Sequence, residues 1–127
     1  FFSQKALLDA MVRAPKLATV INISSGSALT TYEGWSAYGL SKAAMLGLMK
    51  YVSLENPRLE ILNVNPGPMA TDMNRDVRQQ VGTYSWAKKF LDDSLLLKPE
   101  EAAKRILDLY ERRSAHDNDE VVDLRKL

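Results

Sequence analysis

Apolar and polar positions along the chain predict helices and strands in alternation. Apolar residues recur at helical spacing over residues 1–13, and Pro15 follows the end of that pattern. Residues 17–23 form a short β-branched apolar run, bounded by this proline and a Ser/Gly cluster, which is typical of a buried strand. A long apolar helix is expected over 36–55, ending before Pro57 because proline disfavours helical geometry in the residue before it.

The second half of the chain continues the alternation. A strand is expected at 59–64 and a Pro-Gly loop at 65–72, whereas 73–98 is polar and weakly periodic, as expected for short helices. A helix is predicted from Pro99 to about residue 113 and a last strand at 120–124. Strands that alternate with helices imply an α/β fold with a parallel sheet and right-handed crossovers.

The predicted helix 36–55, with Ser36 as its N-cap, is apolar on nearly every side. A helix of that kind is buried on more than one side. One face is expected to cover the sheet, and the other, where Ala44 and Gly47 are small, to meet a second subunit. The alternative is burial within a single chain.

Composition narrows the class of protein. The 127 residues, 46% hydrophobic and 26% charged, are typical of one soluble globular domain, and a net charge of +1 suggests neither a nucleic-acid nor a membrane partner. The longest apolar run, Ala43–Met49, is far below the roughly 18 residues of a membrane span. With no cysteine, thiol catalysis, disulfides and cysteine metal sites are excluded, and no metal site is predicted. The default location is the cytoplasm.

The clearest chemical feature is Tyr38 with Lys42, one helical turn apart at the start of the long helix and preceded by Ser25 at the end of a strand. One turn places the phenol and the ammonium on the same face, where the cation favours phenolate and makes the tyrosine a usable proton donor. In open α/β sheets, ligands bind outside the carboxyl ends of the strands, so Ser25 is expected to face a ligand crevice. These residues suit carbonyl and alcohol chemistry.

The Tyr-x-x-x-Lys spacing alone is weak. The chain repeats it at Tyr84 and Lys88, without an apolar helix around the pair or a strand and serine before it. That second pair is interpreted as a solvated helix face.

Three linked motifs make the first pair specific. They are Asn22-Ile-Ser-Ser25, then Tyr38-Gly-Leu-Ser-Lys42, and then Asn65-Pro-Gly-Pro-Met-Ala-Thr71 after another strand. In order and spacing they resemble the short-chain dehydrogenase/reductase family. Within it, Gly34-Trp-Ser-Ala-Tyr38, Leu54-Glu-Asn-Pro57 and Pro66-Gly-Pro-Met-Ala-Thr-Asp-Met73 are most similar to the sepiapterin reductases and benzil-type diketone reductases. The resemblance implies the C-terminal part of a Rossmann-type doubly wound parallel sheet, about three strands with flanking helices.

The resemblance also implies a reaction. A nicotinamide cofactor, NADP with NAD as the alternative, delivers hydride to a small carbonyl or diketone substrate, and the protein supplies position and a proton. In such an enzyme Tyr38 is the general acid, Lys42 binds the nicotinamide ribose, and Ser25 donates to the substrate oxygen. The family also implies a homodimer paired through helices 1–13 and 36–55.

Further binding residues follow from the same resemblance. The Pro-Gly loop is expected to contact the cofactor, and the residues are Pro66, Gly67, Met69, Ala70, Thr71 and Asp72. Substrate contacts are expected from Ser25, Tyr38, Gly67 and Asp123. An ordinary turn is the alternative for the loop, and an aspartate that merely ends the strand is the alternative for Asp123.

Residues 73–98 are interpreted as a substrate lid, with Tyr84, Trp86 and Phe90 as its aromatic side chains. A hydrophobic core between variable helices is the alternative. No glycine-rich dinucleotide fingerprint is present, so the chain is expected to be the C-terminal half of a reductase, with a catalytic asparagine just upstream of Phe1. The competing interpretation is a non-catalytic fragment or dimerisation module.

Overall fold

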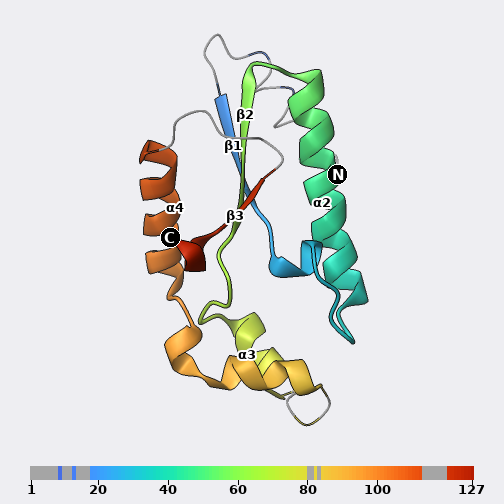
Figure 1. Ribbon diagram of the computed structural model, residues 1–127, viewed down its shortest axis with the longest axis vertical. Coiled ribbons are helices and arrows are strands. Elements are labelled where there is room, and N and C mark those ends of the chain that lie inside the picture. Colours follow the sequence, from blue (N-terminus) through green and yellow to red (C-terminus); the bar gives the residue numbers. More distant parts are fainter. Residues whose placement is uncertain (1–8, 10–12, 14–17, 80–81, 83, 113–119) are drawn as a thin grey trace.

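A three-stranded parallel sheet lies between helices on both of its faces. The computed structural model describes residues 9, 13, 18–79, 82, 84–112 and 120–127. Within these ranges the strand order is β1 (Ala18–Ile23), β2 (Leu59–Asn65) and β3 (Val121–Asp123). Figure 1 shows α2 (Ser36–Glu55) on one side of the sheet and α4 (Pro99–Arg112) on the other. The predicted α/β fold with a parallel sheet is confirmed.

Two apolar clusters hold these layers together. On one face of the sheet, Leu59 and Ile61 of β2 pack against Met49 and Val52 of α2. On the other face, Leu62 and Val64 are buried against Leu124 and the α4 side chains Ile106 and Leu109. Successive β2 residues therefore serve opposite faces, which explains why this strand is apolar nearly throughout.

Most predicted boundaries agree with the structure to within a residue or two. The long helix spans the predicted residues 36–55, but its N-cap is Trp35 and not Ser36. The carbonyl of Trp35 already accepts a helical hydrogen bond from Gly39 N at 2.8 Å, which makes Ser36 the first residue inside the helix. The last strand is shorter than predicted, because residues 124–126 turn into a short 3-10 helix.

In the described part of the chain the sheet covers one face of α2, and the predicted contact of its other face with a second subunit stays a prediction. Its buried side chains are Leu46, Met49 and Val52, which share the face toward the sheet. Leu40 and Leu54 are 70% and 78% exposed. The sheet covers only one face of the helix, so the other apolar side chains remain at the surface.

The short helices expected within 73–98 are present. They are α3 (Asp72–Gln79) and the 3-10 helices Ser85–Leu91 and Asp93–Leu95, all beyond the carboxyl ends of the strands (Figure 1). A parallel bridge between Met69 and Leu97 ties the two ends of this segment together. The segment therefore lies over the same end of the sheet as the predicted site.

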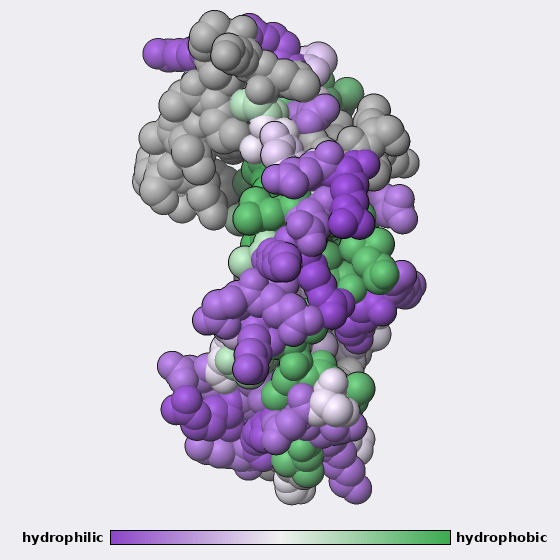
Figure 2. Space-filling model, turned by 90° about the vertical axis from the view of Figure 1, so that its left-hand side faces the viewer, coloured by the Kyte–Doolittle hydropathy of each residue, from purple (hydrophilic) through white to green (hydrophobic). Residues whose placement is uncertain are grey.

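Figure 2 shows the side of the molecule on which α4 lies, where hydrophilic residues cover most of the surface and hydrophobic ones form narrow strips. Among the described helices none is both long enough and apolar enough to cross a bilayer.

Of the predicted helix 1–13 only Asp9 and Arg13 are described, with Arg13 N donating to the Asp9 carbonyl at 3.3 Å. The rest of that helix lies outside the described residues.

Candidate active site at the carboxyl end of the sheet

The loops that follow the three strands enclose a cavity of about 440 Å³. Parallel strands place their carboxyl ends at the same edge of the sheet, and the cavity lies there. It is lined from β1 through the loop to α2, from the Pro-Gly loop, from the segment after it and from the turn after β3. Its lining includes Ser24, Ser25, Tyr32, Trp35, Tyr38, Lys42, Asn65, Pro66, Gly67, Met69, Thr71, Asn74, Trp86, Phe90 and Arg125.

Tyr38 and Lys42 both line this cavity, from the first two turns of α2. The Lys42 ammonium nitrogen lies 5.8 Å from the centre of the Tyr38 ring. It also donates a hydrogen bond of 2.9 Å to the carbonyl of Ile23, the last residue of β1. Lys42 thus fixes the start of α2 against the end of β1. In the described part of the chain, the Tyr38 hydroxyl has no hydrogen-bond partner and is available to a ligand.

Ser25 reaches the same cavity from the end of β1. Its hydroxyl lies 2.8 Å from the Ser27 hydroxyl and accepts a hydrogen bond from Ser27 N at 3.3 Å. These bonds make Ser25 the N-cap of the 3-10 turn Gly26–Ala28 and hold its oxygen in place. The structure therefore brings all three predicted catalytic side chains to one cavity.

The Pro-Gly loop forms the floor beside them. Gly67 has a φ of +76°, a conformation that residues with a side chain rarely adopt, and its N–H donates to Asn65 Oδ1 at 3.1 Å. Pro66, Met69 and Thr71 also line the cavity. Their loop is thus built around a turn that needs glycine.

Ala70 and Asp72 do not line the main cavity. They border a second hollow of about 320 Å³, together with Arg75 and Arg78 at the side of α3. Thr71 lines both hollows, and its hydroxyl accepts a long hydrogen bond of 3.4 Å from Asn74 N. Of the predicted cofactor residues, these two alone face away from Tyr38 and Lys42.

Two polar atoms of cavity residues are buried without a hydrogen-bond partner in the described part of the chain. They are the hydroxyl of Ser24 and the side-chain amide nitrogen of Asn74. Both atoms have almost no exposed surface, so a molecule in the cavity would reach them only after these side chains rotate.

Aromatic rings form the wall of the cavity next to Tyr38. The Trp35 ring lies 4.8 Å from the Tyr38 ring and 5.2 Å from the Trp86 ring, measured between centroids. Trp86 also contacts Phe90 and stacks on Tyr84. The segment 84–91 is therefore packed directly against the residues that precede Tyr38.

Backbone contacts fasten this wall. The Trp86 indole N–H donates to the Glu33 carbonyl at 3.0 Å. Gly34 has a φ of +78°, and a Cβ atom at this position would lie 2.5 Å from the Tyr84 ring. Only glycine lets the ring approach so closely. Lys88, the partner in the second Tyr-x-x-x-Lys pair, is exposed as predicted, whereas Tyr84 belongs to the aromatic wall.

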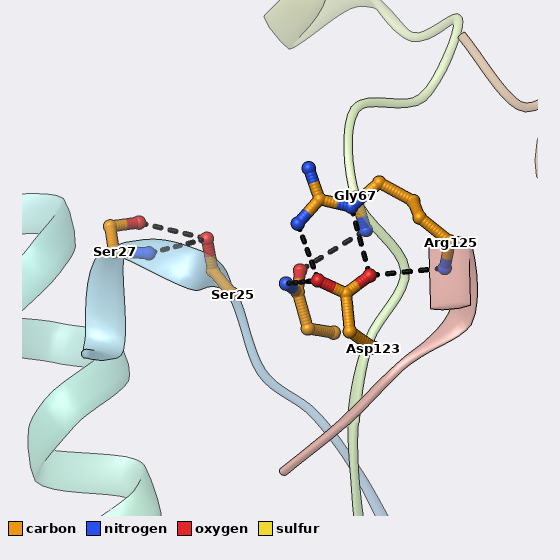
Figure 3. A network of polar contacts seen from close by, with 6 residues as sticks. Ser25, Ser27, Gly67, Asp123 and Arg125 are labelled. Carbon is orange, nitrogen blue, oxygen red and sulfur yellow. Dashed lines mark hydrogen bonds and ion pairs between the residues drawn. The ribbon is translucent and has the colours of Figure 1, made fainter. Parts of the chain in front are cut away.

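Asp123 does not line the cavity; Arg125 does. Both Asp123 oxygens are engaged, as Figure 3 shows: Arg125 N and Nε donate to Oδ1 at 3.0 and 2.8 Å, and Arg125 Nη2 and Asn65 Nδ2 bind Oδ2. The Arg125 side chain lies over Gly67, because a Cβ atom on that glycine would be 2.8 Å from Arg125 Cδ. Sequence reasoning missed Arg125. A basic residue two positions after a strand-ending aspartate was the available signal.

The Arg125 side-chain hydrogen bond holds the pKa of Asp123 below its ordinary value. Because the pKa of Asp123 is lower in the folded protein than in the unfolded one, its pairing with Arg125 stabilises the fold at pH values above the ordinary carboxyl pKa. This stabilisation is lost as the pH falls through the lowered pKa. We expect Asp123→Asn to cost about 1 kcal/mol of unfolding free energy at pH 7. Urea unfolding of both proteins from pH 7 to pH 3 measures the difference between their unfolding free energies, which should narrow below the ordinary carboxyl pKa of 3.8; a difference independent of pH contradicts the assignment.

Comparison with known proteins agrees with this geometry. A family model described as short chain dehydrogenase matches residues 1–82. The sepiapterin reductase of Mus musculus is 33% identical over 83% of this chain and 42% of its own length. The benzil reductase ((S)-benzoin forming) of Saccharomyces cerevisiae is 32% identical over 72% of this chain and 37% of its own length.

A solved structure gives the same result for the fold. The crystal structure of the KRED1-Pglu enzyme superimposes with a TM-score of 0.70 at 32% identity, covering 82% of this chain and 46% of that chain. The chain thus spans less than half the length of each of these relatives.

Proposed function

The chain belongs to the short-chain dehydrogenase family, and from this premise we propose that it carries the catalytic residues of an NAD(P)H-dependent reductase of small carbonyl compounds or diketones. One observation carries the proposal. Ser25, Tyr38 and Lys42, which come from two different elements, converge on one cavity at the carboxyl end of a parallel sheet. The two relatives named as reductases of sepiapterin and benzil support the substrate class.

The proton chemistry follows from the side chains. Tyr38 donates its hydroxyl proton to the oxygen of the bound carbonyl as that oxygen gains negative charge. The Lys42 ammonium, on the same helix face, stabilises the phenolate that remains. Ser25, held by Ser27, offers its hydroxyl to the same oxygen. The reduced nicotinamide, when bound, supplies the hydride.

Cofactor binding is assigned to Lys42 and the Pro-Gly loop. Pro66, Gly67, Met69 and Thr71 line the same cavity as Tyr38. Ala70 and Asp72 are proposed to contact the cofactor from the adjoining hollow, where Arg75 and Arg78 are paired with the carboxylates of Asp72 and Asp93. NADP is the proposed cofactor, with NAD as the alternative.

Residues 73–98 are proposed as the substrate lid. The aromatic side chains Trp86 and Phe90 line the cavity from this segment. Their rings offer flat apolar surface, which suits an aromatic or diketone substrate. Asp123 is proposed to orient the Arg125 guanidinium, with which it is paired. Its predicted direct contact with the substrate stays a prediction.

A homodimer paired through residues 1–13 and α2 is also proposed. It is supported by Leu40, Tyr51 and Leu54, which are all more than half exposed on the α2 surface. Large apolar side chains gathered on one helix face favour contact with another protein surface. Analytical ultracentrifugation of the full polypeptide that the gene encodes tests this, and a monomer at micromolar concentration contradicts it.

The function itself is tested by turnover. The full polypeptide is mixed with NADPH or NADH and 1-phenyl-1,2-propanedione, and cofactor oxidation and alcohol product are measured together. We expect one alcohol formed per cofactor oxidised, with the faster cofactor identifying the natural one. A folded polypeptide that oxidises neither cofactor contradicts the proposal and favours a non-catalytic module.

A further inference from the structure

The cavity has a second polar part, which comes from a different element than the predicted proton donor. It is made by the turn after β3, where Arg125 lines the cavity beside Gly67, two residues after β2. Asn65 lies next to this turn, since its side-chain amide nitrogen donates to Asp123 Oδ2 at 3.3 Å. Ser25 follows β1, which lies on the other side of β2 from β3, and Lys42 lies on α2.

Arg125 is fixed in place and keeps donors free. The Asp123 carboxylate accepts hydrogen bonds from Nε and Nη2 of the guanidinium, which is a bidentate ion pair that fixes the orientation of this edge of the group. A guanidinium carries five N–H donors and no acceptor, so this pairing leaves N–H groups on Nη1 and Nη2 without a partner in the described ranges. Figure 3 shows one guanidinium nitrogen pointing away from Asp123. The Arg125 side chain is 55% exposed, which leaves room for a ligand to reach it.

The charge of the cavity lining favours oxygen acceptors at this end. Lys42 and Arg125 are the charged residues that line the cavity in the described part of the chain, and both are cations. Asp123, which offsets part of this charge, is turned to Arg125 and Asn65 and does not line the cavity. A ligand oxygen that reaches Arg125 therefore meets donors and no competing carboxylate.

We propose that Arg125 is a substrate-binding residue whose free N–H groups bind a second oxygen of the substrate, other than the oxygen that is reduced at Tyr38. The inference rests on the proposed function and adds a substrate class: carbonyl compounds that carry a further carbonyl or carboxylate acceptor. Asp123 is the positioning residue that orients the guanidinium.

The test compares substrates that differ only in the second acceptor. One pair is 1-phenyl-1,2-propanedione and propiophenone, and the other is 4-oxo-4-phenylbutanoate and butyrophenone. In Arg125→Met of the full polypeptide, we expect kcat/KM for an acceptor-bearing ketone to fall about tenfold to a hundredfold, and for its plain partner less than about threefold. The two pairs distinguish a neutral carbonyl from a carboxylate as the second acceptor.

Three further variants keep the test decisive. Arg125→Lys retains the positive charge but not the planar guanidinium. It should therefore recover only part of the preference for the acceptor-bearing ketone over its plain partner. Lys126→Met removes a neighbouring exposed cation that does not line the cavity, and it should leave both substrate pairs unchanged. If Arg125→Met folds poorly, the double variant Asp123→Asn/Arg125→Met, which leaves no unpaired carboxylate, replaces it.

Failure of this inference is separable from failure of the proposed function. If Arg125→Met lowers kcat/KM equally for both members of each substrate pair, or does not lower it at all, the role of Arg125 is overturned. Turnover by the unmodified protein, and with it the proposed function, still stands in that case. If the unmodified protein turns over nothing, ligand binding decides, because both tryptophans of the chain, Trp35 and Trp86, line the cavity and report on it by fluorescence. Binding of 1-phenyl-1,2-propanedione that is weakened about tenfold by Arg125→Met supports the role, and unchanged binding overturns it.

Discussion

Tyr38→Phe should lower kcat of the full polypeptide by about a hundredfold to ten-thousandfold, the usual value of a positioned proton donor. The substitution removes only the hydroxyl, and the ring contact with Trp35 remains. Because the described residues leave this hydroxyl without a hydrogen-bond partner, its loss should not cost stability. Steady-state kinetics with NADPH and 1-phenyl-1,2-propanedione, together with a thermal melt, measure both effects.

A matched control is available on the same helix. Tyr51 is 66% exposed on α2 and does not line the cavity. Tyr51→Phe removes the same atom and should leave kcat unchanged within about twofold. If Tyr38→Phe retains most of the activity, the tyrosine is not the proton donor and the mechanism proposed for this cavity is wrong.

Lys42→Met should lower kcat by about a hundredfold or more and also weaken cofactor binding. The ammonium that stabilises the phenolate is removed, and the Ile23 carbonyl loses the hydrogen bond of 2.9 Å that ties β1 to α2. The second loss should destabilise the protein by about 1 kcal/mol. Kinetics, cofactor titration and urea unfolding measure these three effects.

Lys88→Met is the control for this variant, because Lys88 has the same spacing from Tyr84 that Lys42 has from Tyr38. Lys88 is exposed and does not line the cavity, so its loss should change neither kinetics nor cofactor binding. An effect of similar size in both variants would indicate a general loss of charge, not a site.

Local patterns were sufficient to predict the strands and the long helix. The predicted bounds of α2 held because Pro57 ends it and a hydrogen bond from Gly39 to Trp35 begins it. The N-cap was wrong because capping by a serine was assumed from its type, whereas the backbone turn at Gly34 already starts the helix one residue earlier. The sequence predicted that one face of α2 covers the sheet, but composition shows only that a helix is apolar, not what covers its other face.

The positions of the three proposed catalytic residues at one cavity were predictable, and those of the cavity walls only in part. Ser25, Tyr38 and Lys42 follow from strand ends and helical spacing, which are local. The contact between Trp35 and Trp86 joins segments far apart in the sequence, so no local pattern reveals it.

Arg125 reaches the cavity because the chain turns back as a 3-10 helix after β3, over a glycine with a positive φ. Neither this turn nor its pairing with Asp123 has a periodic signal. Of the residues on which substrate choice is proposed to depend, Asp123, Trp86 and Phe90 were named from the sequence, and Arg125 required the structure.

The central claim is that this cavity holds a carbonyl compound for hydride transfer with Tyr38 as the proton donor. The most direct measurement uses NADPH carrying deuterium at the transferred position of carbon 4, with 1-phenyl-1,2-propanedione and the full polypeptide, and analyses the product by mass spectrometry. The proposal predicts a hydroxyketone with deuterium on the new carbinol carbon, formed by the unmodified protein and at least about a hundredfold more slowly by Tyr38→Phe. An unlabelled product, or a labelled product formed equally fast by both proteins, would contradict it.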